Sequence, residues 1–533
     1  MGVGSRKSER PLRGELAVYA VLILASLPAR LIAMRASIWN DEAWVANSIL
    51  SPSWKEMFYY PRWLQSSPSL FLALDRLVTK VFGPSEPALR LLPLLAGLLA
   101  IPVLAIAFRK LFSPASALCG TSLVIVNFWA AKYPQQVKQY GTDLFASALL
   151  CLLITRYCQR PDRRNFTLLA GGFFVVSFLA NTALFMGPSV IAAVALGPLW
   201  GQPSYHRGRR LKIAFVSFVL CAALNYVLFI RPNRGPTLIE SWADSCLSPS
   251  HPLTSVRMLF SSFGDLLVPQ AFPVTVFLGA AMVLAVAAGA AIALIGAARG
   301  SKNAAVVLLL GPLPVAVAMV SSLLGQYPLL HYPRMLLWAL PGCAALLAAT
   351  LDPLLNAFRQ RIARGNEAPI FYSMAVACLF LVLVLDLGVR RYPRPNERNS
   401  EAMRFLRQSM GPADSLLVHR RMLEQYDYYS RLQGWTARRV YVGNTDWPCC
   451  PRNGPTVFIN PGIQSYAADL RQAAALIERP GQVWMFLPSG QRGHSESLRW
   501  KIEATPGLMQ LQSCSETHRE GFDQSLVLAY QCP

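Results

Sequence analysis

An adjacent pair of acids, Asp41 and Glu42, is the first place in the chain where chemistry could occur. The pair lies in the stretch SIWNDEAWVANSIL, between Trp39 and Trp44, directly after the first long apolar segment. A carboxylate can act as a general base when it lies within hydrogen-bond range of the proton that it removes. An isolated acid pair more often marks a solvated loop or a helix N-terminus, where the helix dipole favours negative charge. The neighbouring loops therefore decide between these two interpretations.

Basic and aromatic side chains in later loops could complete a site with these acids, because the topology predicted below puts them all on the same side of a membrane. Basic groups at the outer ends of spans can bind the phosphate of a membrane-embedded lipid carrier, although each one alone more often anchors its helix at the interface. The tyrosines could stack on a sugar or belong to the aromatic belt of the membrane. An acid close to hydrocarbon could orient an acceptor, bind a metal or pair with a lysine. We expect the substrate-binding side chains to be Arg62, Lys132, Lys138, Tyr140, Asp143, Tyr332 and Arg334.

The composition is that of a polytopic membrane protein. The 533 residues are 53% hydrophobic and 15% charged, with a mean hydropathy of +0.35, whereas soluble domains carry about 25% charged residues. The net charge of +22 would suggest nucleic acid as a partner of a soluble protein. Here the basic clusters are short and lie against apolar runs, where they set membrane orientation instead. The first apolar segment lacks a small-residue cleavage site, so we expect it to remain as a membrane anchor.

Apolar runs of spanning length predict a polytopic α-helical bundle of about 11 transmembrane helices. Short loops rich in Lys and Arg place the N-terminus in the cytoplasm and the segment after the last span outside. Within the first outer loop, 36–87, the pattern at 67–82 suits a helix lying in the membrane interface. The predicted spans cover residues 14–35, 88–108, 114–131, 144–156, 166–183, 187–200, 213–230, 273–297, 304–324, 335–351 and 369–388.

Residues 390–533 differ from the bundle, 1–389, in which we place the catalytic residues. Apolar runs shorten to strand length and alternate with helical patterns at 396–410 and 465–478. Such an alternation predicts a small α/β domain, which the topology puts outside the membrane. The predicted strands are SLLVH (415–419), RRVYVG (438–443), TVFIN (456–460) and QVWMFLP (482–488).

Four of the eleven cysteines fall in this outer domain, which would face an oxidising compartment. They are Cys449, Cys450, Cys514 and Cys532. Adjacent cysteines rarely bond each other, so the first two would each pair with one of the last two. Four free buried cysteines are the equally weighted alternative. Metal binding by this set is not supported, because no CxxC or nearby histidine spacing is present.

Five stretches, taken in order, carry a resemblance to a known family: WNDEAWVAN (39–47), SSPSLFLALDRL (66–77), FGPSEPALRLLPLLAGLLAIPVLAIAFRKLF (82–112), QVKQYGTDLFASALL (136–150) and YPRMLLWALPGCAALLAA (332–349). They resemble GT-C superfamily glycosyltransferases that use a polyprenyl-phosphate sugar. The bacterial relatives of protein O-mannosyltransferases and of lipid A aminoarabinose transferases are the most similar. The resemblance implies a multi-pass enzyme of the bacterial plasma (inner) membrane that transfers a hexose or pentose to a cell-envelope acceptor, which could be a lipid, a glycan or a protein.

The resemblance also implies roles for single residues. Asp41 matches the first-loop acid of the family, a general base that deprotonates the acceptor hydroxyl or amine. Glu42 matches the residue beside it, which supports the base or helps to bind acceptor or metal. Lys138 and Arg334 fall where the family places cations that contact phosphate. Asp143 lies near a second acidic position.

One motif departs from the family pattern, because many relatives have a His-Pro-Pro run where this chain has Ser67, Pro68 and Ser69. The implied reaction is a direct, inverting displacement at the anomeric carbon, in which cations neutralise the leaving polyprenyl phosphate. A divalent cation could assist, but no ligand set for it is visible in the sequence. Two other functions stay open: a transporter or flippase for lipid-linked sugars, which would need internal repeats, and a polymerase or ligase of surface polysaccharide, which would use a long outer segment such as 231–272.

Overall fold

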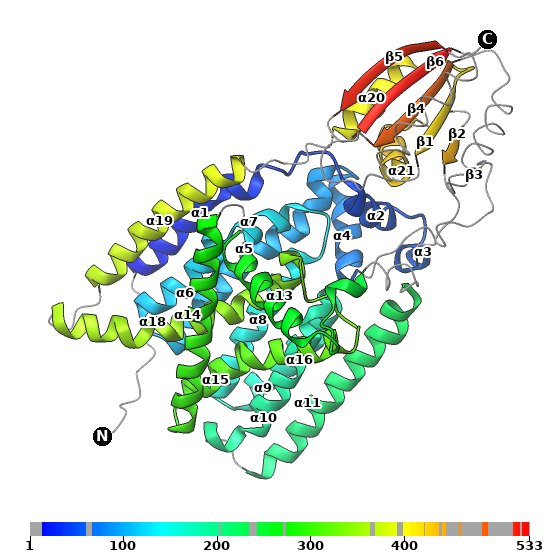
Figure 1. The fold of residues 1–533 in the computed structure, drawn as a ribbon. Helices are drawn as coiled ribbons and strands as arrows, with labels where there is room; N and C mark the ends of the chain where they lie inside the picture. Colours follow the sequence, from blue (N-terminus) through cyan, green and yellow to red (C-terminus); the bar gives the residue numbers. More distant parts are fainter. Residues whose placement is uncertain are drawn as a thin grey trace.

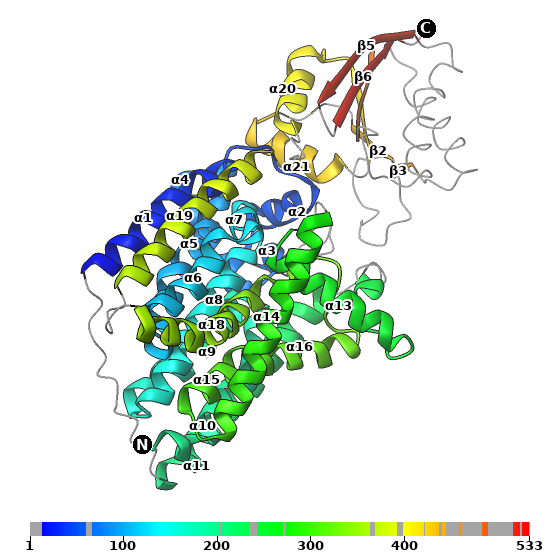
Figure 2. The same ribbon diagram turned by 60° about the vertical axis from the view of Figure 1, so that its left-hand side comes forward.

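The structure is a computed structural model in which a helical bundle carries a small α/β domain at one end (Figure 1, Figure 2). It describes residues 13–59, 67–201, 204–233, 242–269, 273–362, 368–391, 398–419, 422–435, 437, 440–443, 458–459, 482–488, 515–522 and 525–531. The predicted fold class, a polytopic α-helical protein with a C-terminal α/β domain, is confirmed.

The bundle is built from long apolar helices that pack on one hydrophobic core. Helices α1 and α19 run side by side although they come from opposite ends of the bundle sequence (Figure 1, Figure 2). The helices are α1 (Arg13–Leu31), α5 (Glu86–Leu111), α6 (Pro114–Val126), α7 (Phe128–Lys132), α8 (Tyr140–Gln159), α9 (Arg163–Leu179), α10 (Gly187–Ala195), α11 (Ser204–Leu224), α13 (Pro252–Leu267), α14 (Pro273–Ala298), α15 (Lys302–Leu310), α16 (Pro312–Leu323), α17 (Pro333–Leu336), α18 (Leu340–Ile362) and α19 (Ala368–Arg391).

Most of the predicted spans correspond to helices of spanning length. Among the described residues, seven helices are long and apolar enough to cross a membrane, or eight if the bent pair α6 and α7 is one span. The remaining predicted spans, at 166–183, 187–200 and 369–388, overlap α9, α10 and α19. Helix α9 has 17 residues and α10 has 9, whereas α19 has 24 and reaches the roughly 20 residues that a straight span needs. The sequence therefore located the apolar segments, and the number of them that cross the membrane stays a prediction.

Three helices of the first outer loop lie at the end of the bundle that carries the α/β domain (Figure 1). They are α2 (Asn40–Ile49), α3 (Trp54–Phe58) and α4 (Ser69–Phe82). Helix α4 falls where the helical pattern at 67–82 predicted it. One face of α4 buries Phe71 and Leu72, and the other exposes Val81 and Phe82.

The α/β domain has one mixed six-stranded sheet in the order β3-β2-β1-β4-β6-β5. The first four strands in this order pair in parallel, and β6 pairs antiparallel to both β4 and β5. The strands are β1 (Ser415–His419), β2 (Val440–Gly443), β3 (Phe458–Ile459), β4 (Gln482–Pro488), β5 (Ser515–Phe522) and β6 (Ser525–Gln531), with helices α20 (Asn399–Ser409) and α21 (Leu423–Leu432).

Four of these strands lie where the sequence predicted strands, and the β5–β6 hairpin and α21 were not predicted. The helical pattern expected at 465–478 lies outside the described residues. So do the four cysteines of this domain, for which two disulfides or four free thiols were expected.

A second hydrophobic core joins the first outer loop to the α/β domain. Side chains of α2, such as Ala43 and Val45, belong to the same buried cluster as Leu406 of α20 and Tyr429 of α21. Helix α21 lies beside α2 in both views (Figure 1, Figure 2). The acid pair thus lies in a helix that packs on the α/β domain.

Candidate active site

The two acids lie in the first turn of α2 and point in different directions. Successive side chains of an α-helix are turned by about 100°, so neighbours do not face the same partner. The side chain of Asp41 is 23% exposed, whereas that of Glu42 is 1% exposed. Asp41 is therefore the acid of this pair that a substrate can reach.

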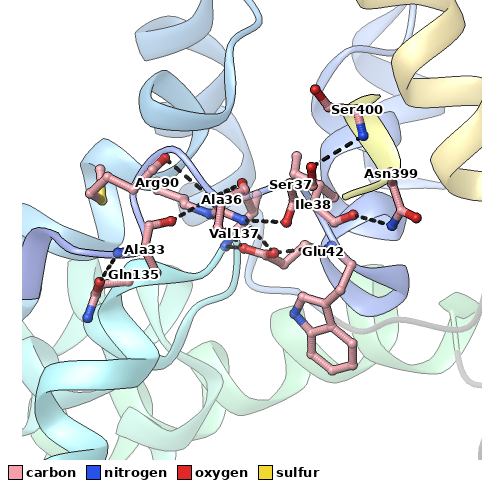
Figure 3. Close-up of polar contacts among 12 residues, drawn as sticks. Ala33, Ala36, Ser37, Ile38, Glu42, Arg90, Gln135, Val137, Asn399 and Ser400 are labelled. Carbon is pink, nitrogen blue, oxygen red and sulfur yellow. Dashed lines mark hydrogen bonds and ion pairs between the residues drawn. The ribbon is translucent and has the colours of Figure 1, made fainter. Parts of the chain in front are cut away.

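Glu42 is held in a buried network of hydrogen bonds (Figure 3). Arg90 of α5 donates to both of its carboxylate oxygens, from Nε at 2.9 Å and from Nη2 at 2.7 Å. The backbone N–H of Val137 donates to the same carboxylate at 2.7 Å. Nη1 of Arg90 also donates to the carbonyls of Ala33 and Ala36, at 2.9 and 2.6 Å. The network ties the first outer loop to α5 and to the loop that precedes α8.

Asp41 faces Arg334, the second residue of α17. Its Oδ2 lies 3.3 Å from Nη1 of the guanidinium. The guanidinium carbon lies 5.6 Å from the ring centre of Trp242 and 5.0 Å from that of Tyr332, and the two rings pack edge to face. Such cation–π contacts stabilise the charged side chain in one position. Its Nε is buried and has no hydrogen-bond partner among the described residues, so Arg334 keeps a donor for a further anionic group.

Lys138 is the second cation beside Asp41. Its side chain is 8% exposed, and no ion pair joins it to an acid among the described residues. Burial lowers the pKa of Lys138 to about 8, Asp41 opposes this change, and Arg334 adds to it. A buried ammonium without a partner is unfavourable. The position therefore favours the binding of an anion.

The loop that carries Lys138 is placed by a break between α6 and α7, which meet at an angle of 59°. Arg30 of α1, which is 1% exposed, donates to carbonyls on both sides of the break, those of Val124 at 3.1 Å and Ala130 at 2.5 Å. Gln135 donates to the carbonyl of Ala29 at 2.9 Å. The bonds from Arg30 satisfy carbonyls that the interrupted helix leaves without intrahelical partners, and the bond from Gln135 holds the loop against α1.

Lys132, another cation of the predicted set, packs on aromatic rings. The ammonium of Lys132 lies over the rings of Phe128 and Trp129, 5.7 and 5.3 Å from their centres. Arg62 lies outside the described residues. Two cations of the predicted set, Lys138 and Arg334, are therefore the ones that the structure places near Asp41.

Tyr140 and Asp143 lie in the first turn of α8, and both are buried. Tyr140 packs against Tyr133, with 5.3 Å between ring centres. Asp143 accepts a hydrogen bond of 2.7 Å from the hydroxyl of Thr182 and makes no ion pair with a lysine among the described residues. Asp143 is thus a buried polar contact between α8 and the turn after α9.

Three residues of the site were not singled out from the sequence. Arg90 and Arg30 lie inside apolar runs, where a charged side chain needs a partner, and this signal could have identified them. Trp242 lies in the long segment 231–272, and nothing in its local sequence indicates that it contacts Arg334. Within the described part of the chain, no group of three or more His, Cys, Asp or Glu side chains could hold a metal ion.

Comparisons with known proteins agree with the resemblance predicted from the sequence. A family model described as dolichyl-phosphate-mannose-protein mannosyltransferase matches residues 66–227. A sequence search of curated proteins found no match. The crystal structure of ArnT from Cupriavidus metallidurans bound to undecaprenyl phosphate is similar, with a TM-score of 0.57 at 14% identity over 97% of each chain. The apo structure of the same protein gives a TM-score of 0.58 at 13% identity, over 97% of this chain and 98% of that one.

A third similar structure is the archaeal oligosaccharyltransferase AglB from Archaeoglobus fulgidus, in complex with an inhibitory peptide and a dolichol phosphate. It gives a TM-score of 0.52 at 14% identity, over 89% of this chain and 69% of that one. At these identities the structures show a common fold. The chain therefore has the GT-C fold of a multi-pass membrane protein, as the sequence predicted.

Proposed function

We propose that the protein is an integral membrane glycosyltransferase that moves a sugar from a polyprenyl-phosphate carrier to an extracytoplasmic acceptor. The observation that carries this proposal is the arrangement of Asp41, a reachable carboxylate, beside two cations. One cation, Arg334, has an unused buried donor, and the other, Lys138, has no paired acid among the described residues. A base next to two cations that can bind an anion is what transfer from a phosphate-linked sugar requires.

The donor phosphate would lie between Lys138 and Arg334. A guanidinium can donate to a phosphate from two nitrogens at once, and Arg334 is already fixed by the rings of Trp242 and Tyr332. Lys138 would gain the anionic partner that its buried position favours. The family match and the neighbours with bound undecaprenyl phosphate and dolichol phosphate support a carrier of this class.

The reaction would be a single displacement. The acceptor hydroxyl or amine gives its proton to Asp41 and forms a bond to the anomeric carbon. The bond between that carbon and the phosphate oxygen breaks, and its electron pair stays on the polyprenyl phosphate, where Lys138 and Arg334 stabilise the added charge. Because attack and departure occur on opposite faces of the sugar, the configuration inverts.

The remaining parts of the proposal follow from the topology. The basic loops predict that Asp41 and the α/β domain face the outside of the bacterial inner membrane. The acceptor is then a component of the cell envelope. No specific observation favours a flippase or a polysaccharide polymerase over a transferase.

The test is an Asp41→Asn variant of the full chain in nanodiscs. The protein is given a panel of undecaprenyl-phosphate-linked hexoses and pentoses, with envelope membranes as the source of acceptor, and the released undecaprenyl phosphate is measured. We expect release to fall by about 10²–10⁴-fold, the usual contribution of a general base. Glu56→Gln is the matched control, because Glu56 is an exposed acid in the first turn of a nearby helix of the same loop.

Two results would overturn the proposal. Release of undecaprenyl phosphate at the wild-type rate by the Asp41→Asn variant would show that Asp41 is not the general base. A wild-type protein that releases no carrier from any donor of the panel, yet carries these lipids across a vesicle membrane, would instead be a transporter.

A further inference from the structure

The segment that leads into the acid pair is bonded to the α/β domain. The backbone N–H of Ile38 donates to the hydroxyl of Tyr429 on α21 at 2.7 Å. Asn399 of α20 donates from Nδ2 to the carbonyl of Ile38 at 3.2 Å, and the N–H of Ser400 donates to Oγ of Ser37 at 3.2 Å (Figure 3). Both polar backbone groups of Ile38 are therefore satisfied by the outer domain.

The same contact continues along α2. Nδ2 of Asn47 donates to the carbonyl of Glu424 in the first turn of α21 at 2.9 Å. The apolar face of α2 shares its buried core with the sheet, including Trp484 and Phe486 of β4. Removal of the domain would thus expose the face of α2 opposite to Asp41.

On its other side the segment is held by the bundle. Arg90 donates to the carbonyl of Ala36 and to Glu42, as Figure 3 shows. Only Trp39 lies between Ile38 and the start of α2 at Asn40, so a displacement of Ile38 moves the first turn of α2 directly. Asp41 lies in that turn.

We propose that the α/β domain positions the catalytic centre, and that Tyr429 fixes the position of Asp41 through its hydrogen bond to Ile38. This inference rests on the proposed function. It assigns to the domain a task other than recruitment of the acceptor or coverage of the site. A general base must lie within hydrogen-bond range of the acceptor proton, and a shift of about 1 Å can lower turnover by two orders of magnitude.

The domain offers a matched pair of variants. Tyr429 and Tyr426 lie one turn apart on α21, both are buried, and each hydroxyl accepts a hydrogen bond from a backbone N–H. For Tyr426 the donor is Ala437, within the domain, at 3.2 Å. Tyr429→Phe and Tyr426→Phe therefore remove the same chemical group, and only the first change touches the segment before Asp41.

The experiment compares both variants with the wild type in nanodiscs, using the undecaprenyl-phosphate sugar that the wild type uses fastest. We expect Tyr429→Phe to lower kcat about tenfold relative to Tyr426→Phe, with the donor KM changed less than twofold, because Lys138 and Arg334 do not depend on this bond. Hydrogen–deuterium exchange at residues 36–44 should be faster in Tyr429→Phe alone, because the Ile38 amide loses its acceptor.

Equal kcat values for the two variants, each per folded enzyme, would overturn the positioning role and leave the proposed function intact. A wild type and a Tyr426→Phe variant that are both inactive would instead refute the proposed function. If Tyr429→Phe does not fold, the Ser37→Ala variant tests the inference instead. It removes the hydroxyl that accepts the hydrogen bond from Ser400, and Ser37 is partly exposed. We expect lower kcat and faster exchange there too, and wild-type values of both would overturn the inference.

Discussion

Replacing Arg90 by lysine tests whether the buried network holds the loop that carries Asp41. Arg90 makes hydrogen bonds of 2.6 to 2.9 Å to both oxygens of Glu42 and to the carbonyls of Ala33 and Ala36. Lysine keeps the charge but has a single nitrogen, which cannot reach both the carboxylate and the carbonyls. The loss of two bonds that involve charged groups, at about 1.5–3 kcal/mol each, lowers the free energy of unfolding by about 3–6 kcal/mol.

The control is Arg109→Lys on the same helix. Arg109 pairs with Glu15 at 2.9 Å and its side chain is 21% exposed; its bonds go to this one carboxylate, so a lysine can keep the ion pair and the free energy of unfolding should change less. Unfolding of both variants by sodium dodecyl sulfate in mixed micelles measures the difference. The reasoning fails if Arg90→Lys unfolds within about 1 kcal/mol of Arg109→Lys. Release of undecaprenyl phosphate per folded molecule should also fall in Arg90→Lys alone, because Glu42 no longer fixes the turn that carries Asp41.

Two further predictions follow from buried charges. With the pKa of Lys138 at about 8, the affinity for undecaprenyl phosphate should fall about tenfold between pH 7 and pH 9 as the free ammonium loses its proton. Native mass spectrometry in nanodiscs measures this affinity, and the Lys138→Arg variant should show no such fall. A wild-type affinity that does not change with pH would contradict the role of Lys138 in phosphate binding. Burial raises the pKa of Asp75 well above 3.8, and its carboxylate oxygens have no partner among the described residues. The folded state thus keeps a proton that the unfolded state loses above pH 3.8, so the free energy of unfolding should decrease by up to about 1.4 kcal/mol for each unit by which pH rises. The Asp75→Asn variant should show a weaker dependence on pH and a higher unfolding temperature at pH 7. Equal pH dependence of the unfolding temperature in variant and wild type would refute this prediction.

The bundle could be predicted because a bilayer imposes length and composition on every segment that crosses it. Strands β1 and β4 could be predicted equally well, since both are buried apolar runs. Strand β5, SETHREGF, escaped prediction because its side chains are exposed along nearly all of its length. A polar edge strand shows no alternation of apolar residues. Helix α21 escaped because its buried face is made largely of tyrosines rather than aliphatic residues.

The site was only partly accessible from the sequence. The residue types at Asp41, Lys138 and Arg334 indicated a base and two cations, but Asp41 and Arg334 are 293 positions apart. Their contact depends on how α2 and α17 are packed, which no local pattern encodes. The position of Lys138 depends on the break after α6, and that break is stabilised by Arg30, a residue about 100 positions earlier in the chain.

The adjacency of Asp41 and Glu42 has a geometric consequence for the site. Because neighbouring residues of a helix point about 100° apart, one acid of the pair must turn inward when the other faces the substrate. The inward acid would be unfavourable alone, and Arg90 supplies the charge that makes its burial acceptable. The outward acid is then held by a helix turn that cannot rotate without breaking a buried ion pair. In the proposed mechanism the acid pair would thus provide both a base and the anchor of that base, so that the chemistry could lie on the short helix α2 rather than within a span.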